Sequence, residues 1–192
     1  MTRSRAAMTA LLILLGTLAA CGIGGSPRPS AFPASPQELQ ALIPEEVDGI
    51  SLQRLSMSGS EFVASGNATE ETQQFLESLG VSTDAVSVAA GFGASPEDGH
   101  LAVVFIFRAD GAPTDRLVSA FQQAANDERG TALGWQPATV GGKHVERASD
   151  PEAPASGTAP GQSLYVYARD SVLVFVATTE ESDAARILEG MP

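Results

Sequence analysis

The chain of 192 residues has a single cysteine, so its folded part must hold together without an internal disulfide. Cys21 ends a run of apolar and small residues that begins at Ala6, and no cysteine follows it. From Pro44 to Pro192 roughly 150 residues remain, enough for one domain with a substantial apolar core. Thiolate metal sites and cysteine nucleophiles are excluded for that part of the chain.

The first residues have the pattern of an export signal. Arg3 and Arg5 precede the apolar run, and the glycines and proline of residues 24–27 end it. The run is therefore shorter than the roughly 20 residues that cross a bilayer, and a cleaved signal peptide is the better interpretation.

The residues around Cys21 indicate the kind of signal. Leu18-Ala19-Ala20-Cys21 resembles the lipobox of bacterial prolipoproteins, and the resemblance covers only the first 21 residues. It implies that residues 1–20 are removed and that the Cys21 sulfur receives a diacylglycerol, with acyl chains such as palmitate holding the protein on the membrane. The expected location is the cell membrane or the outer membrane, and composition does not distinguish them. The alternatives are an uncleaved helix or a chance cysteine.

Acidic side chains outnumber basic ones by 23 to 11, which gives a formal net charge of −12. Removal of residues 1–20 takes away two arginines and no acid, so the expected mature chain carries −14. Such a charge repels phosphate groups, so nucleic acid and anionic lipid head groups are not expected as electrostatic partners.

Composition divides the mature chain into a tether and a domain. Residues 21–34 are rich in Gly, Pro and Ser, and we expect a flexible tether that begins at the lipidated Cys21. Residues 35–192 are expected to form one α+β globular domain. Residues 149–162 are rich in Pro, Ala, Ser and Gly, which predicts a mobile loop within it.

Helical and strand periodicities predict a mainly antiparallel sheet with amphipathic helices packed on it. Residues 101–107 form a continuous apolar run that is typical of a central strand, and residues 164–168 and 172–177 should form a hairpin. Four helices are expected, each with a start signal and one apolar face, the last with Thr178 and Glu181 as its capping box: 35–43, 67–80, 113–126 and 178–191.

An internal repeat relates residues 44–56 to residues 137–149 through the pattern P-x-x-V-x-G-x-x-(L/V)-x-R-x-S. Each copy centres on a two-residue turn, Asp48-Gly49 or Gly141-Gly142, which favours a tight hairpin. Each copy is followed by Phe-Val-Ala, by Thr-Glu-Glu and by a predicted helix. Unless the match is coincidental, the domain contains two related hairpin–strand–helix units.

Catalytic signatures are missing from the sequence. His100 and His144 are the two histidines, and neither has the spacing of a metal ligand pair. No phosphate-binding loop, dinucleotide fingerprint or nucleophile elbow occurs. We therefore expect no enzymatic activity, no cofactor and no metal, and a hydrolase built on one of these histidines is the least favoured function.

Five residues are candidates for ligand contacts. Trp135, Tyr165 and Tyr167 could line a groove, because alternation places both tyrosines opposite Leu164 and Val166. Arg54 and Arg147 occupy matching repeat positions and could hold a carboxylate. The alternative is that the aromatics cover the core and the arginines pair with local acids.

These observations favour a membrane-anchored, exported lipoprotein whose acidic domain is a non-enzymatic binding or interaction module in the cell envelope. Its partner would be the membrane, through acyl chains on Cys21, and another envelope protein or a small ligand. The alternative function is a carrier or chaperone for an apolar or lipid ligand.

Overall fold

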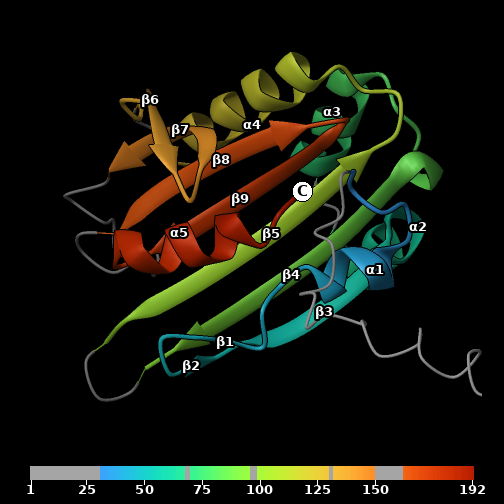
Figure 1. Ribbon diagram of the computed structural model, residues 1–192. Coiled ribbons are helices and arrows are strands. Elements are labelled where there is room, and N and C mark those ends of the chain that lie inside the picture. The colour runs from blue at the N-terminus through green and yellow to red at the C-terminus, as the bar shows by residue number, and fades with distance from the viewer. Residues whose placement is uncertain (1–30, 68–69, 96–98, 130–131, 150–161) are drawn as a thin grey trace, which may run out of the picture.

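The computed structural model describes residues 31–67, 70–95, 99–129, 132–149 and 162–192. Within these residues the chain forms a seven-stranded antiparallel sheet, a separate two-stranded hairpin and five α-helices, which confirms a single α+β fold (Figure 1). The predicted signal peptide, Cys21 and residues 150–161 of the predicted loop lie outside the described residues. The two ends of that predicted loop belong to the fold, since Ser149 pairs with Ser163 in the sheet and Gln162 is buried.

The sheet has the strand order β3-β4-β5-β9-β8-β7-β6. As predicted, the apolar run at 101–107 is a central strand, and 164–168 and 172–177 form a hairpin. The strands span Gln53–Ser58 (β3), Val86–Ala94 (β4), Leu101–Ala109 (β5), Gln136–Val140 (β6), Lys143–Ser149 (β7), Ser163–Arg169 (β8) and Val172–Thr178 (β9). Side chains along β5 alternate between the two faces of the sheet, so apolar residues are needed on both.

One face, called here the α1/α5 face, is covered by two helices and the small hairpin (Figure 1). Helix α1 spans Pro36–Ala41 and α5 spans Glu181–Glu189, while β1 (Glu46–Val47) pairs with β2 (Ile50–Ser51). The buried side chains of these elements pack against Val104 and Ile106 of β5 and against both tyrosines of β8.

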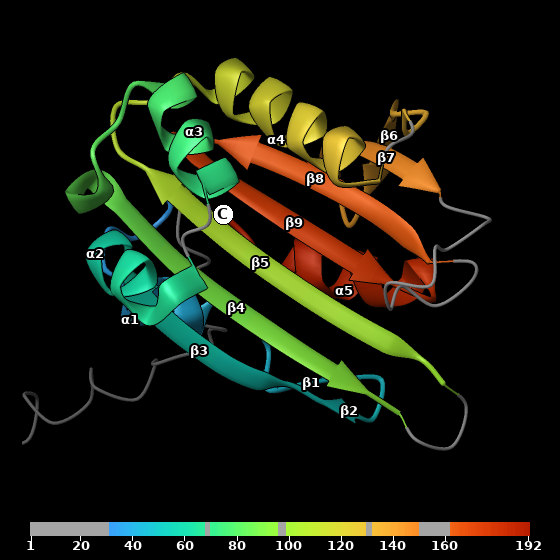
Figure 2. The same cartoon turned by 180° about the vertical axis from the view of Figure 1, so that it is seen from behind.

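The opposite face, called here the α3/α4 face, carries α3 (Glu70–Leu79) and α4 (Thr114–Arg129), as Figure 2 shows. Leu76, Leu79 and Leu117 of these helices are buried against the sheet. Three short elements lie between β3 and β4 in the chain: α2 (Gly59–Phe62), a π-helical turn (Val63–Asn67) and a 3-10 turn (Thr83–Ala85).

Of two helix caps predicted from the sequence, one is present in the structure and the other is not. Ser35 caps α1 as predicted, because its Oγ accepts a hydrogen bond from the backbone N–H of Glu38 at 3.3 Å. The capping box predicted for Thr178 and Glu181 is wrong, since α5 starts after Glu180 and has no side-chain cap. Thr178 still belongs to β9, where it pairs with Ala102 of β5, and its Oγ1 donates to the carbonyl oxygen of Glu180 at 2.8 Å.

The two repeat copies agree in their turns and differ beyond them. Asp48 and Gly49 both have positive φ, as do Gly141 and Gly142, so both hairpins have the primed turn that was predicted. The Phe-Val-Ala at 175–177 lies in β9, whereas that at 62–64 lies in α2 and the π-helical turn. A capping box between Ser58 and Glu61 starts α2 and thereby ends β3.

The chain joins the fold before the domain start predicted at residue 35. The ring of Phe32 is buried, 6.2 Å from that of Tyr167. Arg108 Nη1 donates to the carbonyl oxygens of Phe32 at 3.3 Å and Pro33 at 3.2 Å. Residues 32 and 33, assigned from the sequence to the tether, therefore contact the sheet.

Candidate functional site

The three candidate aromatic residues are divided between the two faces of the sheet. Tyr165 and Tyr167 lie on the α1/α5 face, opposite Leu164 and Val166 as predicted. Trp135 lies on the α3/α4 face, where its ring centroid is 6.4 Å from that of Phe121. The prediction of one groove lined by all three is therefore wrong, because β8 stands between them.

Both tyrosines contact other parts of the fold. The Tyr167 hydroxyl donates to the carbonyl oxygen of Pro192 at 2.8 Å, and Lys143 Nζ donates to the same oxygen at 2.9 Å. The Arg147 guanidinium lies 5.7 Å from the Tyr165 ring centroid. Burial raises the pKa of the Tyr165 phenol, although Ser163 and the charge of Arg147 act in the opposite direction. Tyr167 therefore helps to hold the carboxyl-terminal Pro192 on the fold, and Tyr165 contacts Arg147 of the neighbouring strand β7.

The two candidate arginines lie far apart in the sheet order and have local partners. Arg54 of β3 is 2.5 Å from Glu45 and also donates to the carbonyl oxygen of Ile43 at 3.0 Å. Arg147 of β7 is 2.8 Å from Glu181 of α5. This is the arrangement of the alternative interpretation, in which each arginine is matched by an acid of the chain itself.

The sequence reasoning did not single out two exposed apolar side chains on the α3/α4 face. Leu55 of β3 is 36% exposed and Phe92 of β4 is 44% exposed. Strand register aligns Leu55 with Ala90, Phe105 and Phe175, and aligns Phe92 with Val103. We call these six side chains the apolar strip, and none of the other four is fully buried.

The position of the helices explains why the apolar strip is uncovered. Helix α3 covers the next row of the sheet, where the ring centroids of Phe75 and Phe107 are 5.5 Å apart. Helix α4 contacts the strip only at its edge, where the ring centroids of Phe121 and Phe175 are 5.2 Å apart. Figure 2 shows that the ends of β3, β4 and β5 away from α3 carry no helix on this face. The result is an uncharged, partly aromatic surface across four strands.

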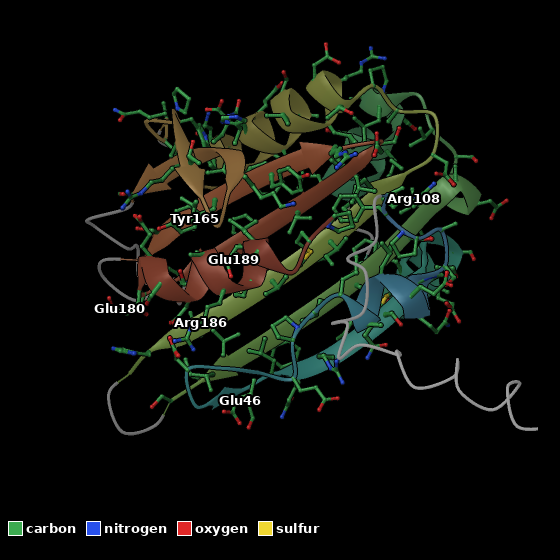
Figure 3. The ribbon with its side chains drawn as sticks, viewed as in Figure 1. Glu46, Arg108, Tyr165, Glu180, Arg186 and Glu189 are labelled. Atoms are coloured by element: carbon green, nitrogen blue, oxygen red, sulfur yellow. The ribbon has the colours of Figure 1, made fainter. Side chains whose placement is uncertain are left out.

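A second unpredicted feature lies on the α1/α5 face, where α5 meets the β1–β2 hairpin. Asp183 in the first turn of α5 is only 1% exposed, and neither carboxyl oxygen has a hydrogen-bond partner among the described residues. The pKa of this carboxyl is raised to about 6, first by burial and then by Asp48 in the hairpin turn. Asp48 is itself paired with Arg186, which Figure 3 shows on the side of α5 that faces the hairpin.

The two histidines lie in different parts of the sheet. His100 precedes β5, and its Nε2 is 3.8 Å from Glu180 Oε1. His144 lies in β7, and its Nδ1 is 3.4 Å from Thr139 Oγ1. Over the described residues, no group of three or more His, Cys, Asp or Glu side chains is placed to hold a metal ion.

No protein-family model matches the chain, and comparisons with curated proteins and with solved structures gave no significant match. Among the helices of the described residues, none has the length and apolar character needed to span a membrane.

Proposed function

We propose that the protein is an exported lipoprotein, anchored through acyl chains on Cys21, whose domain is a non-enzymatic binding module for another envelope protein. The apolar strip carries the proposal. It is the surface on which the partner docks, and the tyrosines and arginines singled out from the sequence serve the fold.

The chemistry of the strip supports a protein partner. The centre of a protein interface is typically poor in charged side chains and rich in aromatic ones. The strip has no charged member and includes Phe92, Phe105 and Phe175, in a chain with 34 charged residues. Exposed apolar surfaces of this kind mark sites of association.

The charge of the chain disfavours self-association as the use of the strip. Two copies would each bring the formal net charge of −14 expected for the mature chain, and like charges oppose their approach. A partner with an apolar docking segment flanked by basic residues fits better, because apolar contact and charge attraction would then act together.

Attachment by lipid would place the strip close to the membrane. Ten residues separate Cys21 from Phe32, where the chain joins the sheet. Covalent geometry limits such a segment to about 35 Å when fully extended. The partner is therefore a membrane protein or a protein held at the membrane surface.

Site-specific photocrosslinking in the producing cells tests this function. A photoreactive phenylalanine analogue at position 92 should give one or a few discrete protein adducts, because this side chain is the most exposed member of the strip. The matched control carries the analogue at His144, which is also exposed on a strand but belongs to the β6–β7 hairpin. The adduct from position 92 should disappear when Leu55→Glu is added.

Equal adducts from both positions, or none from position 92, would contradict the proposal. A carrier for an apolar ligand gives a different result. Organic extraction of the purified protein would then release a lipid, in an amount that Leu55→Glu lowers, and position 92 would crosslink to lipid in place of protein.

A further inference from the structure

Asp48, in the turn of the β1–β2 hairpin, is a neighbour of Asp183 on α5 and raises the pKa of the Asp183 carboxyl. The ion pair between Asp48 and Arg186 of α5 marks the same contact between hairpin and helix. Asp48 is the first residue of the hairpin turn and has a φ of 47°. Asp183 is in the first turn of α5 and is 99% buried, because its residue exposure is 1%. If both carboxyl groups were ionised at this contact, they would repel each other, and the buried one would also lose its solvation by water.

The charged groups around Asp183 do not remove this conflict. Arg186 lies toward the hairpin, and its guanidinium is matched by Asp48 and not by Asp183. Glu180 adds a second negative charge near Asp183, whereas His100 acts in the opposite direction. On the other side of α5, Glu181 is matched by Arg147 at 2.8 Å. Asp183 is therefore the group that takes up a proton.

A proton on Asp183 changes the contact from repulsive to attractive. As carboxylates, both groups only accept hydrogen bonds, and neither oxygen of Asp183 has a partner among the described residues. As a neutral acid, Asp183 can donate to the Asp48 carboxylate, and a hydrogen bond to a charged acceptor is among the stronger ones in proteins.

We propose that Asp48 and Asp183 share one proton and form a latch that holds the β1–β2 hairpin on α5 in weakly acidic conditions and loosens when both groups are ionised. The hairpin is the natural moving part. It is a two-stranded sheet of its own, without ladder pairing to the seven-stranded sheet in the described residues. The latch is independent of the partner that the apolar strip binds.

The direction of the pH effect follows from the pKa of Asp183. The folded value of about 6 lies above the ordinary value of 3.8, so folding and latching favour the protonated acid. The pair therefore stabilises the folded, latched state fully at a pH below the ordinary pKa of 3.8. This stabilisation is lost as the pH rises through about 6.

Nuclear magnetic resonance on the full chain, purified from cells that produce it, tests the latch. The carboxyl carbon of Asp183 should titrate with a midpoint near 6. Hydrogen-exchange protection in the hairpin, measured relative to the β8–β9 hairpin, should fall about tenfold between about pH 5 and about pH 7.5. The amide of Leu52, which donates to the Glu45 carbonyl oxygen at 2.8 Å, is a suitable reporter.

Three variants sharpen the test. Asp183→Asn cannot ionise, so hairpin protection should become independent of pH. Asp48→Asn should lower the titration midpoint of Asp183. The matched control is Asp170→Asn, since Asp170 is also the first residue of a two-residue hairpin turn, with a φ of 52°, and it is exposed. It should leave the midpoint and the protection unchanged.

Two results would overturn the latch. One is a titration of Asp183 near pH 4, the usual range of an aspartate. The other is a normal titration near 6 with no change of hairpin protection, which would show that the pair does not hold the hairpin. If Asp183→Asn does not fold, the wild-type titration, the exchange data and Asp48→Asn still decide the question.

Discussion

Gly91 of β4 and Ile43 are in such close contact that a Cβ atom at position 91 would lie 2.6 Å from Ile43 Cγ2. Gly93, two residues further along the same face, has the same relationship to Ile50 of β2, at 2.8 Å from its Cγ2. The absence of side chains at these two positions lets the α1–β1 segment and the hairpin pack directly on the backbone of β4.

Gly91→Ala should therefore destabilise the protein by about 1–3 kcal/mol, because the new methyl group overpacks a close contact in the core. Urea unfolding followed by circular dichroism measures the change. Gly134→Ala is the matched control, since a Cβ there meets no atom within 4 Å. A Gly91→Ala protein as stable as the control would show that Ile43 relaxes without cost.

Local patterns predicted much of this fold. The capping residue Ser35, the apolar run at 101–107 and the turn at Gly141-Gly142 each act within a few residues, and each is found as expected. Helix periodicity shows which side of a helix is buried but not which face of the sheet it covers. Nothing in the sequence therefore indicated that α3 and α5 lie on opposite faces.

The candidate sites depend on tertiary placement and were missed for that reason. Phe92 is exposed because neither α3 nor α4 extends over it. The sequence of β4 alone gives no sign of where those helices lie. An acid in the first turn of a helix, such as Asp183, is ordinarily explained by the helix dipole. Its burial arises from contact with a hairpin more than 130 residues earlier in the chain.

The apolar strip should not be needed for folding. Phe92→Ser is expected to lower the free energy of unfolding by only about 1 kcal/mol, because 44% of this residue is already exposed. Phe107→Ala is the comparison, since Phe107 is on the same face but buried beneath α3, and its truncation should cost about 3–5 kcal/mol. Equal losses in chemical denaturation would mean that the strip is part of the core.

The contact of Phe32 with Tyr167 predicts that the domain is less stable without its first residues. Phe32→Ala should lower the free energy of unfolding by about 1–3 kcal/mol, because it removes a buried ring from the α1/α5 face. Ala31→Ser changes the exposed neighbouring residue and should have no measurable effect. Identical unfolding curves for Phe32→Ala and the wild type would place the start of the stable fold at Ser35.

Replacement of Asp183 should stabilise the protein in a pH-dependent way. Because the folded pKa is raised to about 6, an ionised Asp183 opposes folding above that pH, and Asp183→Asn removes this cost. The expected gain is about 1–3 kcal/mol near pH 8 and should vanish below about pH 4. Unfolding curves at the two pH values measure it. A gain of equal size at both would point to packing in place of ionisation.

Cys21 should be the determinant of membrane attachment. If the sulfur carries the acyl chains, Cys21→Ser should abolish fatty-acid labelling of the protein and shift it from the membrane pellet to the soluble fraction. Without the acyl chains, the strongly acidic chain has no electrostatic attraction to anionic lipid. Ser26→Ala, which changes a nearby hydroxyl outside the Leu-Ala-Ala-Cys segment, should leave both properties unchanged. A Cys21→Ser protein that still labels and still sediments with membranes would contradict the lipoprotein assignment.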